Sequence, residues 1–357
     1  MSFNEIPRAF KRVTAPESSS RSTVVEKKHY DLEASSVDME VKLFSPEKKR
    51  NDNAIIFLPG WSMTADSKSS ELFGTSLSKE SGANTHVLTT RLEQRGANQP
   101  EDPLYEEAQA IAIYIQEKGL KHITLVGHSQ GGDRALDVAT LLQNNPDLTL
   151  DGLILINPVG LYEQGGVELA TKFAGNSAFT IASVDKEINR HGINPATREK
   201  AQDAIAPALQ AGNDVVSGIA KEAITSKFDY PARFKSEVNE MAQLNRHTKE
   251  LTVPIVIVTG MEDSVSDPSS IASAPEVATL KADLEDSTEE TVKQDATLRA
   301  REAYLKETLF PQSPYVRMLV PEKHGVHALP FLRPDTTAKT ALYMLERFNR
   351  NVPEEKY

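Results

Sequence analysis

The sequence GHSQGG at residues 127–132 carries a serine, Ser129, where an apolar stretch ends and a helical pattern begins. Residues 122–126 are mostly β-branched and apolar, which is typical of a buried parallel strand. From residue 130 to residue 142 the apolar side chains recur at helical spacing. A strand that passes into a helix with almost no loop strains the residue at the turn, and flanking glycines make room for it. The pattern therefore predicts a nucleophile elbow with Ser129 at its tip.

A carboxylate candidate follows a second apolar run. A serine hydroxyl is a weak nucleophile near neutral pH, so it needs a base within hydrogen-bond reach and a third group that orients the base. Asp263 comes just after the run VPIVIV at residues 253–258, at the expected carboxyl end of a strand. Glu262 and Asp267 lie nearby, and both read as exposed loop acids. We therefore expect Asp263 to be the orienting acid.

Two histidines are candidates for the base. His324 and His327 follow the strand-like run at residues 315–320, in the sequence PEKHGVHALP. The H-x-x-H spacing also occurs in zinc sites, but no third ligand is visible in the sequence. We therefore expect no metal and no cofactor, and the residues alone leave either histidine as the base.

Two backbone N–H donors are needed for the negative charge that develops on the reacting carbonyl oxygen. The N–H of Gln130 is one candidate, because it lies at the N-terminus of the helix that follows Ser129. The second should come from the loop after the apolar run at residues 54–58, where the sequence reads PGWSM. Trp61, the sole tryptophan, lies in this loop, and its ring either lines an acyl pocket or simply packs.

Strand-like and helical patterns alternate along the chain. The expected strands are residues 54–58, 85–88, 122–126, 152–156, 253–258 and 315–320, and the expected helices are 69–79, 104–117, 130–142 and 336–348. Two earlier runs, at residues 23–30 and 37–44, predict an antiparallel pair at the edge. Because strands that are apolar on both faces alternate with helices, we predict an α/β fold with a mostly parallel central sheet covered by helices on both faces.

The pattern also suggests how the chain is divided. Residues 1–21 form a polar, flexible arm, and residues 22–158 and 251–357 form the core. Residues 159–250 read as helices only and predict a cap over the carboxyl edge of the sheet, where ligands bind in open α/β folds. An acidic helical excursion at about 266–314 interrupts the core, and its charge run indicates a solvated helix rather than a metal site.

The order and spacing of these motifs resemble the α/β-hydrolase superfamily, from about residue 50 to residue 350 apart from the two insertions. In relatives the acid often lies in a G-x-x-D turn after the strand, which residues 260–263 match. The histidine commonly stands about seven residues before a proline, and His327 has this relation to Pro334, whereas His324 does not. The resemblance therefore implies the catalytic triad Ser129, Asp263 and His327, with His324 as the alternate base.

The resemblance also bears on the oxyanion hole. It implies that Trp61, the residue after the glycine of the loop, supplies the second donor through its backbone, beside the N–H of Gln130. Relatives often carry His-Gly in this loop, and the present chain has Pro59 and Gly60 instead. The loop-ordering histidine side chain is therefore absent.

Composition excludes several classes of protein. The chain of 357 residues has a formal net charge of -11 and a sequence pI near 5.3, without a basic stripe, so nucleic acid is not expected as a partner. The absence of cysteine excludes disulfides, a thiol nucleophile and cysteine metal sites. The first twenty residues lack a signal-like apolar segment and no run reaches spanning length, so we expect a cytoplasmic protein without a membrane span.

The predicted activity is hydrolysis of carboxylic esters through an acyl-enzyme, by a carboxylesterase or lactonase acting on small to medium substrates. A lipase, a thioesterase and a cofactor-free haloperoxidase use the same machinery and stay open. Epoxide hydrolases and dehalogenases of this fold carry an aspartate at the elbow, which Ser129 contradicts. A non-catalytic binding protein or receptor of the same fold is the alternative from another class, and the sequence leaves the oligomeric state open.

Overall fold

The computed structural model describes most of the expected core. The described residues are 21–22, 25–33, 35–50, 52–61, 63–94, 102–163, 165–169, 172, 238–239, 241–260, 263, 265, 290–320, 329–332 and 334–349. Residues 1–20 of the expected arm, most of the expected cap, residues 266–289 of the expected acidic excursion and residues 321–328 lie outside them. Within the described residues, no helix combines the length and the apolar character that a membrane crossing requires.

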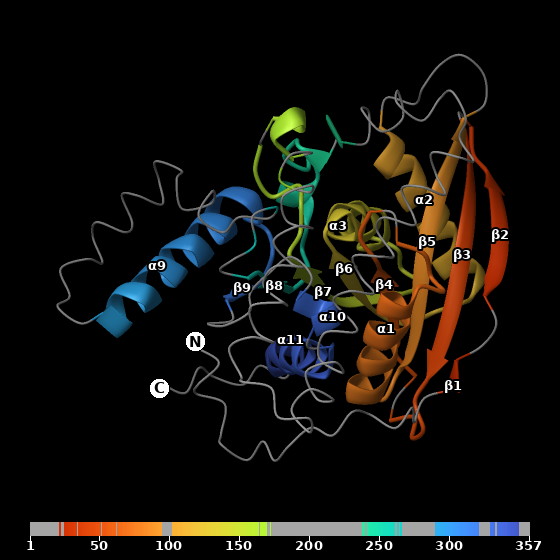
Figure 1. The fold of residues 1–357 in the computed structure, drawn as a ribbon, viewed down its shortest axis with the longest axis horizontal. Coiled ribbons are helices and arrows are strands. Elements are labelled where there is room, and N and C mark those ends of the chain that lie inside the picture. Colours follow the sequence, from red (N-terminus) through yellow and green to blue (C-terminus); the bar gives the residue numbers. More distant parts are fainter. Residues whose placement is uncertain are drawn as a thin grey trace, which may run out of the picture.

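A nine-stranded sheet forms the centre of the described structure (Figure 1). Its strands are β1 (Arg21–Ser22), β2 (Glu26–Asp31), β3 (Ser35–Ser45), β4 (Ala54–Leu58), β5 (Asn84–Gln94), β6 (His122–His128), β7 (Thr149–Ile156), β8 (Ile255–Val258) and β9 (Val316–Leu319). The order is β1-β3-β5-β4-β6-β7-β8-β9, with β2 also paired to β3. All pairs from β5 to β9 are parallel, and the pairs that involve β3 are antiparallel. The predicted fold class and the antiparallel edge pair are confirmed.

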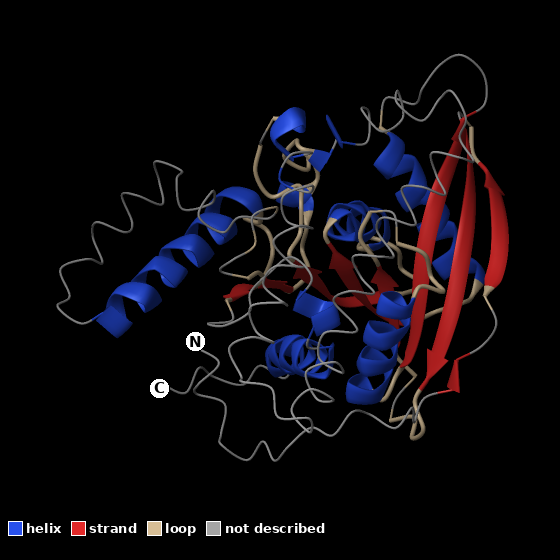
Figure 2. Ribbon diagram, viewed as in Figure 1, coloured by secondary structure: helices blue, strands red, loops and turns tan. Residues whose placement is uncertain are grey.

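Helices cover both faces of the parallel strands (Figure 2). They are α1 (Lys68–Ser81), α2 (Pro103–Glu117), α3 (Gln130–Leu142), α9 (Glu290–Tyr304), α10 (Leu329–Leu332) and α11 (Pro334–Asn349), with a 3-10 turn at Thr248–Glu250 and a π-helical turn at Leu305–Leu309. Helices α2 and α3 share one apolar cluster with the sheet, and α1, α10 and α11 share a second. Side chains alternate along β4, because Ile56 and Leu58 belong to the first cluster and Ile55 and Phe57 to the second.

Strand β5 is longer than the sequence pattern indicates. We expected a strand at residues 85–88, and β5 extends to Gln94. Its second half, TTRLEQ, is largely polar and lacks the apolar run that marks a buried strand. Strand β3 pairs with β5 in an unbroken register from Phe44 opposite Thr85 to Ser35 opposite Gln94. The backbone hydrogen bonds of this tertiary pairing therefore extend the strand beyond its apolar part.

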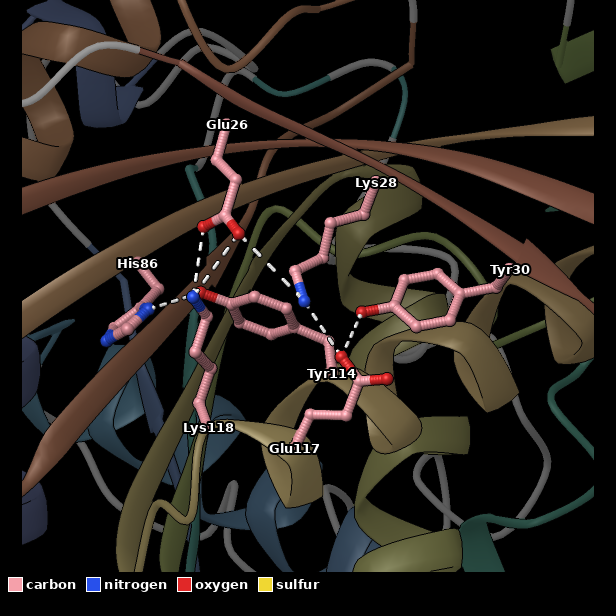
Figure 3. Close-up of polar contacts among 7 residues, drawn as sticks. All are labelled: Glu26, Lys28, Tyr30, His86, Tyr114, Glu117 and Lys118. Atoms are coloured by element: carbon pink, nitrogen blue, oxygen red, sulfur yellow. Dashed lines mark hydrogen bonds and ion pairs between the residues drawn. The ribbon is translucent and has the colours of Figure 1, made fainter.

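Side chains of β2 fasten the antiparallel edge of the sheet to α2 (Figure 3). Lys28 lies 2.8 Å from Glu117, and Lys118 lies 3.0 Å from Glu26. The two ammonium groups lie 5.5 and 5.6 Å from the ring centroid of Tyr114, and the hydroxyl of that tyrosine lies 2.8 Å from His86 Nδ1. The lysines and glutamates are partly exposed, so we assign most of the stabilisation to the buried tyrosine and its packing.

Candidate active site

The order of the strands predicts a crevice at the carboxyl ends of β4 and β6. Strand β4 lies between β5 and β6, so the chain runs outward from β4 to β5 and returns to β6 on the other side. Connections that diverge in this way leave a crevice at the carboxyl ends of the two strands, where open α/β folds bind ligands. Leu58 and Gly127 are paired at these ends. Gly60 and Ser129 therefore follow their strands into the same crevice.

Ser129 occupies the corner between β6 and α3. Its φ of 54° and ψ of -121° lie in a region that residues with a side chain rarely adopt. Its N–H donates to Ile156 O at 3.1 Å, and its carbonyl accepts from Gly132 N at 2.9 Å and from Val159 N at 3.3 Å. The side chain is buried, with 2% of its surface exposed. The strained corner lies where the glycine-flanked motif indicates, whereas the catalytic role of Ser129 stays a prediction.

The glycines of the motif are required by close backbone packing. A Cβ on Gly127 would lie 2.3 Å from Gly131 O, and a Cβ on Gly131 would lie 2.0 Å from Leu58 O. Both distances are shorter than van der Waals contact with fixed backbone atoms. A Cβ on Gly60 would lie 3.1 Å from Ser129 Cβ, so the loop after β4 runs directly against the serine. This loop is the one from which we expected the second oxyanion donor.

Gln130 begins α3 and is held by a buried ion pair. Its side-chain Oε1 accepts from Arg134 Nη2 at 2.8 Å, and Arg134 Nε lies 2.5 Å from Glu107 of α2. Glu107 also accepts from Leu92 N and from Thr90 Oγ1, each at 3.1 Å. The first turn of α3 is thus anchored through α2 to the end of β5. No local sequence pattern indicates this network, because its members come from three separate elements.

Trp61 lies partly buried beside the crevice. It packs against a small apolar cluster formed by α2, the chain after β7, both described ends of the expected cap and the chain after β8. The members of the cluster are Leu104, Val159, Leu169, Val238, Met241, Ala242 and Val265. A ring that packs in this way can still line an acyl pocket, so both readings of the ring stay predictions. The backbone role of Trp61 stays a prediction.

Asp263 follows β8 in a tight turn and is 2% exposed. Its N–H donates to Gly260 O at 3.2 Å, and its carboxylate Oδ1 accepts from Val265 N at 2.8 Å. The N–H of Gly260 donates to the side chain of Asn157, at the end of β7, at 2.9 Å. Asn157 contacts the turn of Asp263 and was not among the residues that the sequence pattern singled out. Its position directly after an apolar strand was the available signal.

The predicted base, His327, and its alternate, His324, lie outside the described residues. Glu262 and Asp267, the alternatives to Asp263 as the acid, also lie outside them. Helix α10 begins two residues after His327, and its Phe331 ring meets the ring of His128 edge-on, with centroids 4.9 Å apart and planes at 80°. The chain that follows the predicted base therefore packs against the residue next to Ser129.

Two buried aspartates on α3 share one amide. Asn245 Nδ2 donates to Asp133 Oδ1 at 2.6 Å and to Asp137 Oδ1 at 2.9 Å, and Asn245 N donates to Gly160 O at 2.8 Å. Burial raises the pKa of Asp133 to about 7 and that of Asp137 to about 8. Each carboxyl group therefore keeps its proton to a higher pH than an exposed aspartate does. Gly160 and Asn245 lie near the two ends of the expected cap, so this cluster ties both ends to the helix that begins at the serine.

The described part of the site combines the Ser129 side chain with the N-terminus of α3. The positive dipole end of α3 lies at the corner that holds Ser129, because Gln130 is the first residue of the helix. The buried carboxylate of Asp263 follows β8, which is separated from β6 by one strand, β7. Within the described ranges, no three histidine, aspartate or glutamate side chains are grouped so that they could hold a metal ion. The arrangement can therefore support attack by a serine oxygen on a carbonyl carbon.

Comparisons with known proteins agree with this fold. A family model described as serine aminopeptidase, S33, matches residues 93–291, which include Ser129 and Asp263. A search of curated proteins found no match. A probable hydrolytic enzyme from Pseudomonas aeruginosa is similar in structure, with a TM-score of 0.52, 13% identity, and coverage of 90% of this chain and 93% of that chain. A thermophilic esterase from Thermogutta terrifontis has a TM-score of 0.49 and 14% identity, with coverage of 92% and 100%.

The likeness to the Pseudomonas protein shows a shared fold, and the family match goes further. It spans more than half of the 357 residues and begins at the end of β5, so it includes the corner and the turn described above. The chain is therefore a hydrolase of the α/β-hydrolase superfamily and belongs to the serine aminopeptidase S33 family.

Proposed function

We propose that the protein is a serine hydrolase that cleaves carboxylic ester bonds, as a carboxylesterase or lactonase acting on small to medium acyl substrates. The observation that carries the proposal is the backbone of Ser129, held at a φ of 54° between β6 and α3 and pressed against the loop after β4. Strain of this kind costs about 1–3 kcal/mol and persists where the surrounding structure over-determines it, which is common at active sites.

The mechanism assigns one step to each residue. His327 takes the proton of Ser129 as the serine oxygen attacks the carbonyl carbon, and Asp263 orients the imidazole and stabilises its charged form. The backbone N–H groups of Gln130 and Trp61 donate to the developing oxyanion. One such donor is worth about 3 kcal/mol in comparable sites. Water, activated by the same histidine, then opens the acyl-enzyme and restores the serine.

Peptide bonds are the second candidate substrate, because the matching family is described as a serine aminopeptidase. Cleavage of an amide needs a proton on the leaving nitrogen, and the imidazolium formed in the first step can supply it. The two activities share every residue of the proposed mechanism. They therefore differ only in the part of the site that receives the leaving group.

The test compares native protein with Ser129→Ala on three substrate sets: p-nitrophenyl esters from acetate to decanoate, simple and homoserine lactones, and aminoacyl p-nitroanilides. We expect the native protein to hydrolyse short esters or lactones, and Ser129→Ala to lose roughly a thousandfold or more in kcat/KM. Ser45→Ala, which changes a serine at the end of β3, is the matched control and should keep native rates.

Each outcome assigns the function differently. Faster turnover of the anilides than of the esters would favour the peptidase alternative. Equal ester hydrolysis by native protein and Ser129→Ala would remove the serine from the mechanism. Failure of a fluorophosphonate to label Ser129, read by peptide mass spectrometry, would contradict its nucleophilic role independently of the substrate chosen.

A further inference from the structure

Asn157 adopts a backbone conformation that residues with a side chain rarely take. Its φ is 44°, and among the described residues only Ser129 shares a positive φ without being glycine. Asparagine tolerates this region better than most residues, yet the conformation is still strained and must be held in place. Asn157 is also fully buried. A residue this constrained, directly after β7 and therefore next to the strand that leads to Ser129, calls for a physical reason.

Both polar ends of Asn157 bind the chain that leads to Asp263. Its N–H donates to Val258 O at 2.7 Å, and its side-chain Oδ1 accepts from Gly260 N at 2.9 Å. Val258 is the last residue of β8, and Gly260 begins the turn whose carbonyl accepts from the N–H of Asp263. The left-handed backbone of Asn157 is therefore accompanied by a hydrogen bond from Gly260 N–H, at the start of the turn that ends at Asp263, to its side chain.

The neighbours of Asn157 bind the serine corner. Ile156 O accepts from Ser129 N at 3.1 Å, and Val159 N donates to Ser129 O at 3.3 Å. Residues 156–159 thus contact Ser129, the proposed nucleophile, through one set of hydrogen bonds. They contact the chain that leads to Asp263, the proposed acid, through another set. This segment is a direct hydrogen-bonded bridge between the two groups.

We infer that Asn157 is a positioning residue, which fixes the turn of Asp263 relative to Ser129. The inference rests on the proposed function and deepens it, because it assigns to Asn157 a role in the reaction through Asp263 rather than through the substrate. Loss of the Oδ1 acceptor leaves the N–H of Gly260 without its buried partner, so the turn must move to satisfy it. A displaced carboxylate holds the imidazole less well and stabilises its positive form less, which lowers both kcat and the pKa of the base.

Asn157→Gly separates the two properties of the residue. Glycine adopts the positive φ without strain but has no side-chain acceptor, so the backbone is retained and only the bond to Gly260 is lost. We expect kcat for ester hydrolysis to fall about tenfold or more with KM within about twofold, and the acid limb of the kcat/KM profile to move to lower pH. In the Asp263→Asn background, the same change should have almost no further effect, because its action passes through Asp263.

Asn145→Gly is the matched control. Asn145 Oδ1 accepts from Asp147 N at 2.9 Å in the exposed turn after α3, so this variant removes a similar bond away from the crevice and should keep native kinetics. Asn157→Asp keeps an acceptor oxygen at the same place and should retain kcat within about fivefold. This second variant tests the inference even where the glycine variant fails to fold.

The outcomes separate the inference from the proposed function. Native kcat and an unchanged pH profile in Asn157→Gly, together with loss of activity in Ser129→Ala and Asp263→Asn, would overturn the role of Asn157 alone. Full loss of activity in a folded Asn157→Asp would also overturn it, since the acceptor is present there. Activity that survives Ser129→Ala would instead overturn the proposed function.

Discussion

At the scale of single residues, the site contains residues that their neighbours hold in unfavourable backbone conformations. Ser129 and Asn157 both adopt positive φ values, at an expected cost of about 1–3 kcal/mol each. The backbone around Ser129 forms three hydrogen bonds to the surrounding chain. The strained backbone and the hydrogen bonds that hold it therefore involve the same few residues. A change that removes one partner should have effects larger than the single bond suggests.

The buried pair of Glu107 and Arg134 allows a stability prediction at this scale. Glu107→Ala should lower the free energy of unfolding by about 3–5 kcal/mol, because it leaves the charge of Arg134 buried without its counterion. Arg134→Met should cost less, because Glu107 keeps the donors Leu92 N and Thr90 Oγ1. Urea unfolding of both variants measures the two values.

The double variant provides the control for this prediction. Glu107→Met with Arg134→Met removes both charges and fills a similar volume, so it should recover part of the loss seen in Glu107→Ala. Equal losses in all three proteins would mean that packing, and not the unpaired charge, dominates at this site.

At the scale of elements, α3 connects the serine corner to both described ends of the expected cap. Asp133 and Asp137 lie one turn apart on this helix and accept from the same amide of Asn245. Asp102 raises the pKa of both aspartates, whereas Arg134 lowers the pKa of Asp133 and Arg246 lowers the pKa of Asp137. Burial is the largest effect, and it raises the pKa of both aspartates well above their usual value near 3.9.

The sign of this shift predicts how stability depends on pH. Between about pH 4 and the raised values of about 7 and about 8, the folded protein binds more protons than the unfolded chain. Stability from this pair is therefore greatest at low pH, falls as the pH rises through this window, and is level above it. Asp137→Asn keeps an acceptor for Asn245 but cannot ionise, so it should be about 1–3 kcal/mol more stable than native protein at pH 8.

Urea unfolding at pH 4.5, 6 and 8 measures the difference, which should shrink toward the lowest pH. The Asp137→Asn variant should also show a smaller fall in stability between pH 6 and pH 8 than native protein. The same slope in both proteins, or a variant that is less stable at pH 8, would contradict a raised pKa at this position.

The elements were predictable where their apolar pattern is local. The run AIIFL predicted β4 with its bounds, and the corner motif predicted the junction between β6 and α3. The second half of β5 was not predictable, because its polar residues become a strand through pairing with β3. Helix α1 began and ended close to the expected bounds, where Ser67 caps its N-terminus and Gly82 ends it in the left-handed conformation.

At the scale of the whole molecule, the alternation of strands and helices predicted a parallel sheet but not the order of its strands. The crevice lies between β4 and β6 because β5 was placed on the far side of β4, and nothing local in the sequence decides this. The bonds around the site also join distant residues: Asn157 and Gly260 are 103 positions apart, and Asn245 and Asp133 are 112 apart. Single-sequence patterns describe neighbours within about two turns, so they find Ser129 and miss the residues that hold it.

Strand β9 ends the sheet among the residues that the structure describes, and it gives the last prediction. A strand that ends a sheet exposes N–H and C=O groups that can pair with another molecule, so proteins cover or shorten such strands. Here β9 is four residues long, and Glu302 of α9 covers it: its Oε1 accepts from Met318 N at 2.8 Å, and its Oε2 lies 2.9 Å from Arg317 Nη1. Glu302→Ala uncovers that N–H and removes the counterion of Arg317, so we expect association that grows with concentration, measured by size-exclusion chromatography with light scattering. Arg299→Ala, an exposed change on the same helix, should elute as native protein, and an unchanged elution of Glu302→Ala at every concentration would show that this carboxylate does not protect the edge.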